Sequence, residues 1–378
     1  MKIAYFRVSY RKRNIKTARR WKNSQNKFLP GRSTRKMFRL PDSIAEGVNY
    51  RLIIGLGISL IILILMIWAG IRWLADSPLK GRQREDATVM SAFHEGTLPV
   101  VRDAADNEAN ASAQEQVIIP TMENIHTIKD MESLLKYLYT IDQTAYVDES
   151  VLDIDALLAV DLRTNLMKDP KILIIHTHSQ ETFIDSRPDE TDDTIVGVGS
   201  VLADILATQY GIGVVHDLSR YDVVDGRTER GNSYERMEPS VRHILEMYPT
   251  IEVVLDLHRD GVPDDMRLVT EVNGKPTARL MFFNGVSCES NGDRGRKVDG
   301  LPNPFLKDNL AFSLHMQLAT NEAYPGLTRR LYIKPYRYSL HMKPKSLLVE
   351  VGANTSTVQE AKNAMGPLAE VLVKVLGQ

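Results

Sequence analysis

The chain has 378 residues, of which 43% are hydrophobic and 25% charged, so it has enough apolar material for one large or two modest globular domains. Its single cysteine, Cys288, excludes an intramolecular disulfide, so the folded part must be held together by its core alone. Metal ligands, if the protein uses any, must therefore be histidines and carboxylates.

The net charge of −1 hides a segregated distribution, because residues 1–51 hold 15 lysines and arginines against only Asp42 and Glu46. The next 20 residues, 52–71, carry no charge. A helix of that length spans about 30 Å, which is the thickness of a bilayer core. The length of the apolar run argues against a core helix, and the long segment before it argues against a cleaved signal peptide. We therefore predict one transmembrane helix over 52–71.

The basic segment 1–51 predicts the orientation of this helix. By the positive-inside rule the segment stays in the cytoplasm, and the chain from residue 72 onward lies outside. A basic segment can also bind nucleic acid, but beside a membrane span it is more simply an orientation signal and a contact with anionic lipid. We expect a single-pass membrane protein with no nucleic-acid partner.

The region that follows the span divides into a linker and a small helical element. Residues 72–124 are polar and poorly patterned, and we interpret them as a linker. Residues 125–170 contain helical patterns, such as MESLLKYLYT and DIDALLAVDL. We expect them to form a small element that packs on the main domain.

From residue 171 to 378, short apolar runs alternate with helix-like segments. The predicted strands are Ile172–Ile175, Gly213–His216, Ile251–Leu257, Arg279–Phe283 and Ser346–Val351. The predicted helices are Val196–Tyr210, Ser233–Met247, Asp308–Ala323 and Val358–Leu376, the last preceded by a capping box of Thr357 and Glu360. This alternation predicts an α/β domain with a central mixed, mostly parallel sheet, whose site lies at the carboxyl ends of the strands.

Three of these strands end in side chains that a zinc hydrolase needs. The stretch KILIIHTHSQETF runs from a buried strand into His178 and Glu181, which form a His-x-x-Glu motif. A third ligand, His258, ends the strand IEVVLDLH. Two histidines and one glutamate leave a fourth coordination position open for water, as in catalytic rather than structural zinc sites. We predict that these three residues bind zinc.

Two more carboxylates have predicted roles beside these ligands. Glu350, at the end of SLLVEVGAN, is a carboxylate that is not a ligand, and we predict that it acts as general base and then general acid. Asp256 lies two residues before His258, so both point the same way in an extended strand. It is a candidate partner of a metal ligand, or a buried carboxylate elsewhere in the network.

Other residues leave alternatives open. His176 competes with His178 for the ligand role, and only the spacing to Glu181 favours His178. Arg337 and His341 precede the last strand, where they either line a substrate groove or belong to a packed loop. A single histidine at a strand end is more often structural than a ligand. The metal prediction depends on the coincidence of three strand ends.

The sequences KILIIHTHSQETF, VVLDLHRDG, YPGLTRRLYIKPYRYSLH and SLLVEVGANT, in this order, resemble the stage II sporulation protein P family. The resemblance covers the chain from about residue 125 to its end. The family is similar to zinc-dependent N-acetylmuramoyl-L-alanine amidases, so it implies an α/β sheet with helices on both faces. By position, His178, Glu181 and His258 match the family's metal-binding motifs, and Glu350 matches its catalytic acid. Ser339 and Ser356 stand where we expect asparagine, which affects fine substrate positioning.

The resemblance implies a peptidoglycan hydrolase that cleaves the amide between N-acetylmuramic acid and L-alanine. Members are also associated with cleavage of peptide cross-links, and they act in the space between mother cell and forespore during engulfment. Their partners are stage II sporulation proteins D and M. Two alternatives are a zinc peptidase that acts only on stem peptides and a non-catalytic wall-binding scaffold. The presence of all four proposed groups argues against the scaffold.

Overall fold

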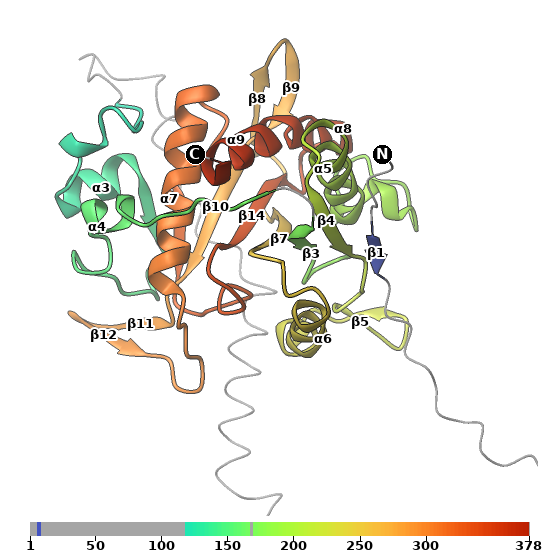
Figure 1. Ribbon diagram of the computed structural model, residues 1–378, viewed down its shortest axis with the longest axis horizontal. Helices are drawn as coiled ribbons and strands as arrows, with labels where there is room; N and C mark the ends of the chain where they lie inside the picture. Colours follow the sequence, from blue (N-terminus) through green and yellow to red (C-terminus); the bar gives the residue numbers. More distant parts are fainter. Residues whose placement is uncertain (1–5, 9–117, 167–168, 378) are drawn as a thin grey trace, which may run out of the picture. The chain divides into compact units, whose positions relative to one another are not determined.

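The computed structural model describes residues 6–8, 118–166 and 169–377, and its centre is an eight-stranded sheet (Figure 1). The strands follow one another across the sheet in the order β1 (Phe6–Val8), β4 (Gly213–Asp217), β3 (Pro170–Ile175), β7 (Val253–Asp260), β14 (Ser346–Ala353), β10 (Leu280–Gly285), β13 (Leu331–Lys334) and β2 (Tyr139–Ile141). Each neighbouring pair is parallel except β10 with β14, which is antiparallel. The prediction of a mixed, mostly parallel sheet is therefore confirmed.

The central strands are apolar because both of their faces are buried. In β3, Ile172 and Ile174 belong to the larger hydrophobic core, whereas Leu173 and Ile175 belong to a smaller core on the other face. Successive side chains of a strand point to opposite faces, so a strand covered on both sides has no polar face. The unbroken apolar run in the sequence is the result.

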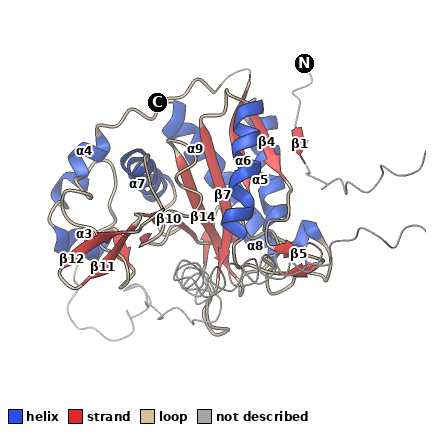
Figure 2. Ribbon diagram, turned by 90° about the horizontal axis from the view of Figure 1, so that it is seen from below, coloured by secondary structure: helices blue, strands red, loops and turns tan. Residues whose placement is uncertain are grey.

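Helices cover both faces of the sheet (Figure 2). On one face the larger core includes side chains of α5 (Ile195–Gln209), α7 (Leu306–Ala323), α8 (Val358–Asn363) and α9 (Met365–Gly377). On the other face α6 (Ser233–Met247) contributes Met237, Val241 and Ile244 to the smaller core. The α/β architecture that the sequence predicts is present.

The C-terminal helix differs from its prediction. The capping box at its start is confirmed, since the Thr357 hydroxyl accepts from the Glu360 amide and the Glu360 carboxylate accepts from the Thr357 amide. The helix ends at Asn363, however, and a second helix begins at Met365. Two helices therefore replace the single one expected over 358–376.

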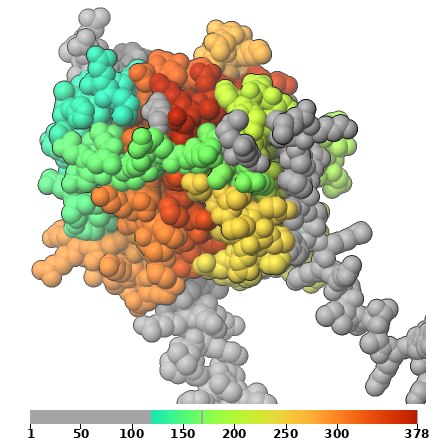
Figure 3. Space-filling view, in the orientation of Figure 1, coloured from blue at the N-terminus to red at the C-terminus, as the bar shows by residue number. Residues whose placement is uncertain are grey.

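The segment 118–166 is part of the main domain and not a purely helical addition. It contains the short turns of η2 (Ile125–Thr127), the helices α3 (Met131–Tyr137) and α4 (Ile154–Leu158), and strand β2. Tyr139 and Thr140, which we expected in a helix, instead pair with β13 at one edge of the sheet. Leu134 and Leu157 are buried in the larger core. Figure 3 shows this segment, in teal and green, lying against C-terminal elements in orange.

Three hairpins and one short turn extend from this framework, and none of them was predicted. They are β5 (Val223–Val224) with β6 (Arg227–Thr228), β8 (Val269–Val272) with β9 (Lys275–Ala278), β11 (Cys288–Asn291) with β12 (Arg294–Lys297), and η3 (Thr191–Asp193). Asn273 and Gly274 between β8 and β9 both have positive φ, which is the tight-turn geometry that this residue pair favours. Asp225 and Gly226 between β5 and β6 also have positive φ, so two of the three hairpins carry a local turn signal that the sequence analysis did not use.

The N-terminal region is described only at residues 6–8. The sequence assigns these residues to a separate basic segment, whereas the structure pairs them with β4 at the edge of the sheet. The predicted span over 52–71 and residues 72–117 of the predicted linker lie outside the described residues. Within the described ranges, no helix is long and apolar enough to cross a bilayer.

Candidate metal centre

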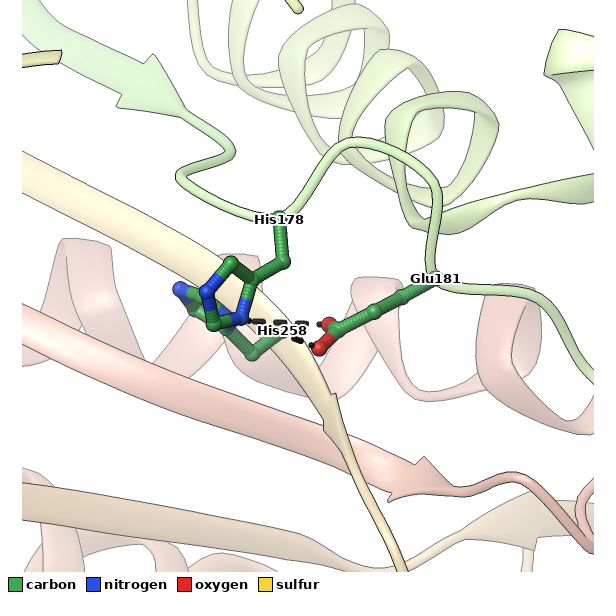
Figure 4. A group of neighbouring side chains, drawn as sticks. All are labelled: His178, Glu181 and His258. Carbon is green, nitrogen blue, oxygen red and sulfur yellow. Dashed lines mark ion pairs between the residues drawn. The ribbon is translucent and has the colours of Figure 1, made fainter. Parts of the chain in front are cut away.

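The structure brings His178, Glu181 and His258 together at the carboxyl ends of two neighbouring strands (Figure 4). The loop after β3 carries His178 and Glu181, and the last part of β7 carries His258. One potential ligand atom from each residue lies within 4.8 Å of those from the other two. Glu181 points one oxygen at each histidine, with its Oε1 3.4 Å from His178 Nδ1 and its Oε2 3.4 Å from His258 Nδ1.

Backbone and side-chain hydrogen bonds fix the loop that carries two of these residues. The amide of Glu181 donates to the carbonyl of His178, which closes a tight turn, and the amide of Arg259 donates to Glu181 Oε2 at 2.9 Å. The buried Asp222 accepts from the Ser179 hydroxyl at 2.6 Å and from the Gln180 amide at 2.9 Å. The tight turn formed by the His-x-x-Glu motif therefore directs the side chains of His178 and Glu181 toward the same site.

Asp256 is a second buried carboxylate that supports His258. It accepts from the amide of Thr177 at 3.0 Å and from its hydroxyl at 2.7 Å. Its Oδ1 also lies 3.0 Å from His258 Nε2. Asp256 thus contacts the imidazole on the side away from Glu181, which is the arrangement that orients a metal-binding histidine.

The charges at this centre suit a divalent cation. Burial alone would raise the pKa values of Asp256 and Glu181 and lower that of His258. Mutual attraction outweighs burial, so both carboxyl pKa values are lowered and the pKa of His258 is raised well above its usual value. Two buried carboxylates thus surround one imidazolium in the metal-free chain. A divalent cation can take the place of its proton, so the residues present fit a zinc ion.

His176 lies behind the centre and both of its ring nitrogens are occupied. Its Nδ1–H donates to the carbonyl of Leu257 at 3.1 Å, and its Nε2 lies 2.8 Å from Nε2 of the buried His216. Gly199 makes room for this pair, because a Cβ there would lie 2.6 Å from the His176 ring. The geometry therefore favours His178 over His176 as the ligand, which the sequence left open.

Glu350 lies beside the centre but does not belong to the ligand cluster. It pairs with His258 in the register of β14 and β7, so both side chains emerge on the same face of the sheet. Its Oε2 is shielded from solvent and has no hydrogen-bond partner among the described residues. Burial, opposed by His258 and reinforced by Asp260 and Glu181, raises the pKa of Glu350 to about 8.

Arg337 and His341 contact α6 and not the ligand cluster. Arg337 Nη2 lies 3.0 Å and His341 Nε2 lies 3.1 Å from the same oxygen, Oε2 of Glu238. The Nδ1–H of His341 donates to the carbonyl of Tyr338. Of the two interpretations that the sequence left open, the packed loop is the one that these contacts support.

Two residues that the sequence analysis did not single out also lie at the centre. Arg230, in the loop before α6, has its Nη1 4.0 Å from Glu181 Oε1. Tyr234, in the first turn of α6, packs its ring against His178 with centroids 5.7 Å apart. Both belong to the stretch RTERGNSYER, which has no metal-ligand spacing and runs from β6 into the first turn of α6. No local signal could have linked this stretch to β3.

Comparisons with solved structures, curated proteins and family models give results of different weight. Similar solved structures include the apo form of the N-acetylmuramyl-L-alanine amidase Ami1 from Mycobacterium abscessus, with 11% identity over 55% of this chain and 99% of that chain and a TM-score of 0.34. They also include the CwlD amidase from Clostridioides difficile in complex with the GerS lipoprotein, with 14% identity, 54% and 98% coverage and a TM-score of 0.34. Scores and identities this low carry no argument about this chain.

No curated protein gives a significant match. The model of Stage II sporulation protein P, in contrast, matches residues 88–373, which is well over half of the chain and includes all of the residues described above at the centre. The chain belongs to the Stage II sporulation protein P family.

Proposed function

We propose that this protein is a zinc-dependent peptidoglycan hydrolase of sporulation that cleaves the amide between N-acetylmuramic acid and L-alanine. The observation that supports this proposal is the convergence of His178, Glu181 and His258 beside Glu350, a half-buried carboxylate with a raised pKa, in a chain of this family. Two imidazoles and one carboxylate are the donor set of catalytic zinc. When bound, zinc would act as a Lewis acid toward the scissile carbonyl.

The residues of the chain itself then have distinct roles. Glu350 removes a proton from the attacking water and delivers it to the leaving nitrogen of L-alanine. A pKa raised to about 8 suits a group that both accepts and donates a proton near neutral pH. Asp256 orients His258, and the amide of Arg259 holds Glu181 in place. His178 is the most exposed of the three ligands, so we expect substrate to reach the centre past this side chain.

The proposal includes the setting in which the enzyme acts. An anchor over 52–71 would hold the catalytic domain outside the membrane, in the space between mother cell and forespore. The part of the predicted linker before residue 118 would have a coil-like reach of roughly 35–40 Å, which lets the domain contact peptidoglycan close to the membrane. Stage II sporulation proteins D and M are the proposed partners. Peptide cross-links are a second proposed target.

A digest of purified peptidoglycan by the full-length chain in detergent tests this function. Mass spectrometry should detect free stem peptides that begin at L-alanine, absent after chelation and restored by added zinc. Products that keep the glycan–peptide amide but have shortened stems would mean that the enzyme is a zinc peptidase. An undigested wall in the presence of bound zinc and both partners would contradict a hydrolase.

A further inference from the structure

The guanidinium of Arg230 faces the metal centre, and no described residue forms a hydrogen bond or a close ion pair with it. Its Nη1 lies 4.0 Å from Glu181 Oε1, beyond hydrogen-bond distance, and its side chain is 27% exposed. Among the described residues, no other carboxylate lies within ion-pair distance of this guanidinium, and no hydrogen bond satisfies it. A guanidinium has five N–H donors, so most of its binding capacity is available to a ligand.

The backbone at Arg230 is, in contrast, firmly held. The carbonyl of Arg230 accepts from the amide of Ser233 at 3.1 Å, and the amide of Glu229 donates to the carbonyl of Asp222 at 2.7 Å. The guanidinium of Arg236 donates to the carbonyls of Glu229 and Tyr221. A fixed backbone with an unsatisfied side-chain head is the arrangement expected of a residue that binds a ligand.

The same frame connects this backbone to the metal-ligand loop. Asp222, whose carbonyl holds Glu229, accepts through its carboxylate from Ser179 and Gln180, which lie between His178 and Glu181. The backbone at Arg230 and the loop that carries the ligands are therefore held at a defined distance from each other. A substrate that is held by Arg230 would have its neighbouring bonds placed at the centre.

Charge neutralisation of Glu181 does not explain why an arginine stands at position 230. A metal ion bound by Glu181 already supplies the compensating positive charge, and a second cation 4.0 Å from that carboxylate repels the metal. An arginine at this position therefore weakens metal binding unless it has another anion to bind. Arginine is also the side chain that best matches a carboxylate, through two parallel hydrogen bonds.

We propose that Arg230 binds a free carboxylate of the substrate close to the scissile amide and so selects stems that carry one. This inference rests on the proposed amidase function. The distance from the metal to this carboxylate follows from three steps: about 2 Å from the metal to Glu181 Oε1, 4.0 Å from Oε1 to Arg230 Nη1, and about 2.8 Å from Nη1 to the carboxylate. A carboxylate bound by Nη1 therefore lies at most about 9 Å from the metal. Two extended residues span about 7 Å. The α-carboxylate of the stem residue that follows L-alanine lies at that distance.

The test compares two muropeptides that differ only at this group. N-acetylmuramoyl-L-alanyl-D-glutamate has the free α-carboxylate, and N-acetylmuramoyl-L-alanyl-D-isoglutamine has a neutral carboxamide instead. For the full-length zinc enzyme, Arg230→Gln should raise the KM for the first substrate by roughly 10- to 100-fold, the value of a lost charged hydrogen bond. The KM for the second should change less than about threefold, and Arg230→Lys should restore part of the difference.

Two further measurements separate this role from a structural one. Zinc affinity of Arg230→Gln should be equal to that of the wild type or tighter, because a repelling charge is removed. The matched control is Arg227→Gln, an exposed arginine of the β5–β6 hairpin that precedes Arg230, which should change neither KM nor zinc affinity. Weaker zinc binding, or equal losses with both muropeptides, would overturn the role proposed for Arg230.

A wild-type chain that cuts neither muropeptide would contradict the amidase function but would still test Arg230 through binding. Calorimetric titration of the zinc-loaded chain should then give tighter binding of the glutamate muropeptide than of the isoglutamine one. Arg230→Gln should remove this difference. Equal affinity of the wild type for both compounds would refute the proposal.

Discussion

At the residue scale, Glu181 is the group that connects the parts of the candidate metal centre. One of its oxygens lies near His178 and Arg230, and the other lies near His258 and the amide of Arg259. These contacts hold the carboxylate in the orientation that a shared cation would need. The main change expected on metal binding is the loss of the proton on His258.

Metal affinity should therefore rise with pH. Attraction by Asp256 and Glu181 outweighs burial and raises the pKa of His258 well above its usual value, so the metal-free chain keeps this proton at neutral pH. A cation must displace the proton, and each unit of pH below that pKa should weaken zinc affinity about tenfold. Competition with a chromophoric chelator between pH 6 and 8 measures the slope. A pH-independent affinity would contradict protonated His258.

Glu350→Gln should separate metal binding from proton transfer. Glutamine keeps the size of the side chain but cannot carry the proton, so turnover of peptidoglycan should fall by about 10²- to 10⁴-fold. Zinc content should stay at one ion per chain, because Glu350 is outside the ligand cluster. Glu271→Gln, at the exposed position of β8, is the matched control and should leave both values unchanged. Unchanged wall degradation by Glu350→Gln would refute its role as acid and base.

At the element scale, the approach of α5 to β3 and β4 depends on one glycine. A Cβ on Gly199 would lie 2.6 Å from the ring of His176 and 3.1 Å from that of His216. Both histidines are fully buried and hydrogen-bonded to each other, so neither ring can move aside without breaking this hydrogen bond. Helix α5 can therefore lie against the ends of these strands only if residue 199 is a glycine, which has no Cβ.

Gly199→Ala should lower the free energy of unfolding by about 1–3 kcal/mol, the usual cost of overpacking a core. The matched control is Gly366→Ala in α9, where a Cβ would meet no atom within 4 Å and alanine is the better helix former. That variant should be as stable as the wild type or slightly more stable. Urea denaturation followed by circular dichroism measures both. Equal stability of the two variants would show that α5 can shift to accommodate a methyl group.

Helices and strands with a long hydrophobic pattern could be predicted from the sequence. Short strands that pair with a partner far away in the sequence could not. Helix α6 was predicted with its observed bounds, Ser233–Met247, because its apolar positions recur at helical spacing. Strand β2 was missed because three residues carry no period and their partner β13 is nearly 200 positions away. In that case tertiary pairing outweighed the helical propensity of the preceding α3.

At the scale of the whole molecule, two arrangements of the N-terminal region exclude each other. A membrane span over 52–71 would place residues 6–8 and the catalytic domain on opposite sides of the bilayer. The structure pairs residues 6–8 with β4, which requires both on the same side. Only one of the two can hold in the anchored protein, and our proposal predicts the span.

Cysteine labelling tests this topology directly, because Cys288 is the only cysteine in the chain. In a Cys288→Ser background, Ser112→Cys should react with a membrane-impermeant maleimide in intact protoplasts. Ser24→Cys should react only after the membrane is permeabilised. Reaction of both positions in intact protoplasts would favour the β1–β4 pairing over a cytoplasmic N-terminus.

The sequence by itself determined the α/β class, the candidate ligands Glu181 and His258 and the position of Glu350, because strand periodicity and residue spacing are local properties. It could not distinguish His178 from His176, since the two are separated by a single residue and differ only in what surrounds them. Tertiary structure decided this by engaging both nitrogens of His176 with Leu257 and His216. It also brought Arg230 to Glu181. Contacts between segments about 50 residues apart depend on packing, and no local pattern encodes them.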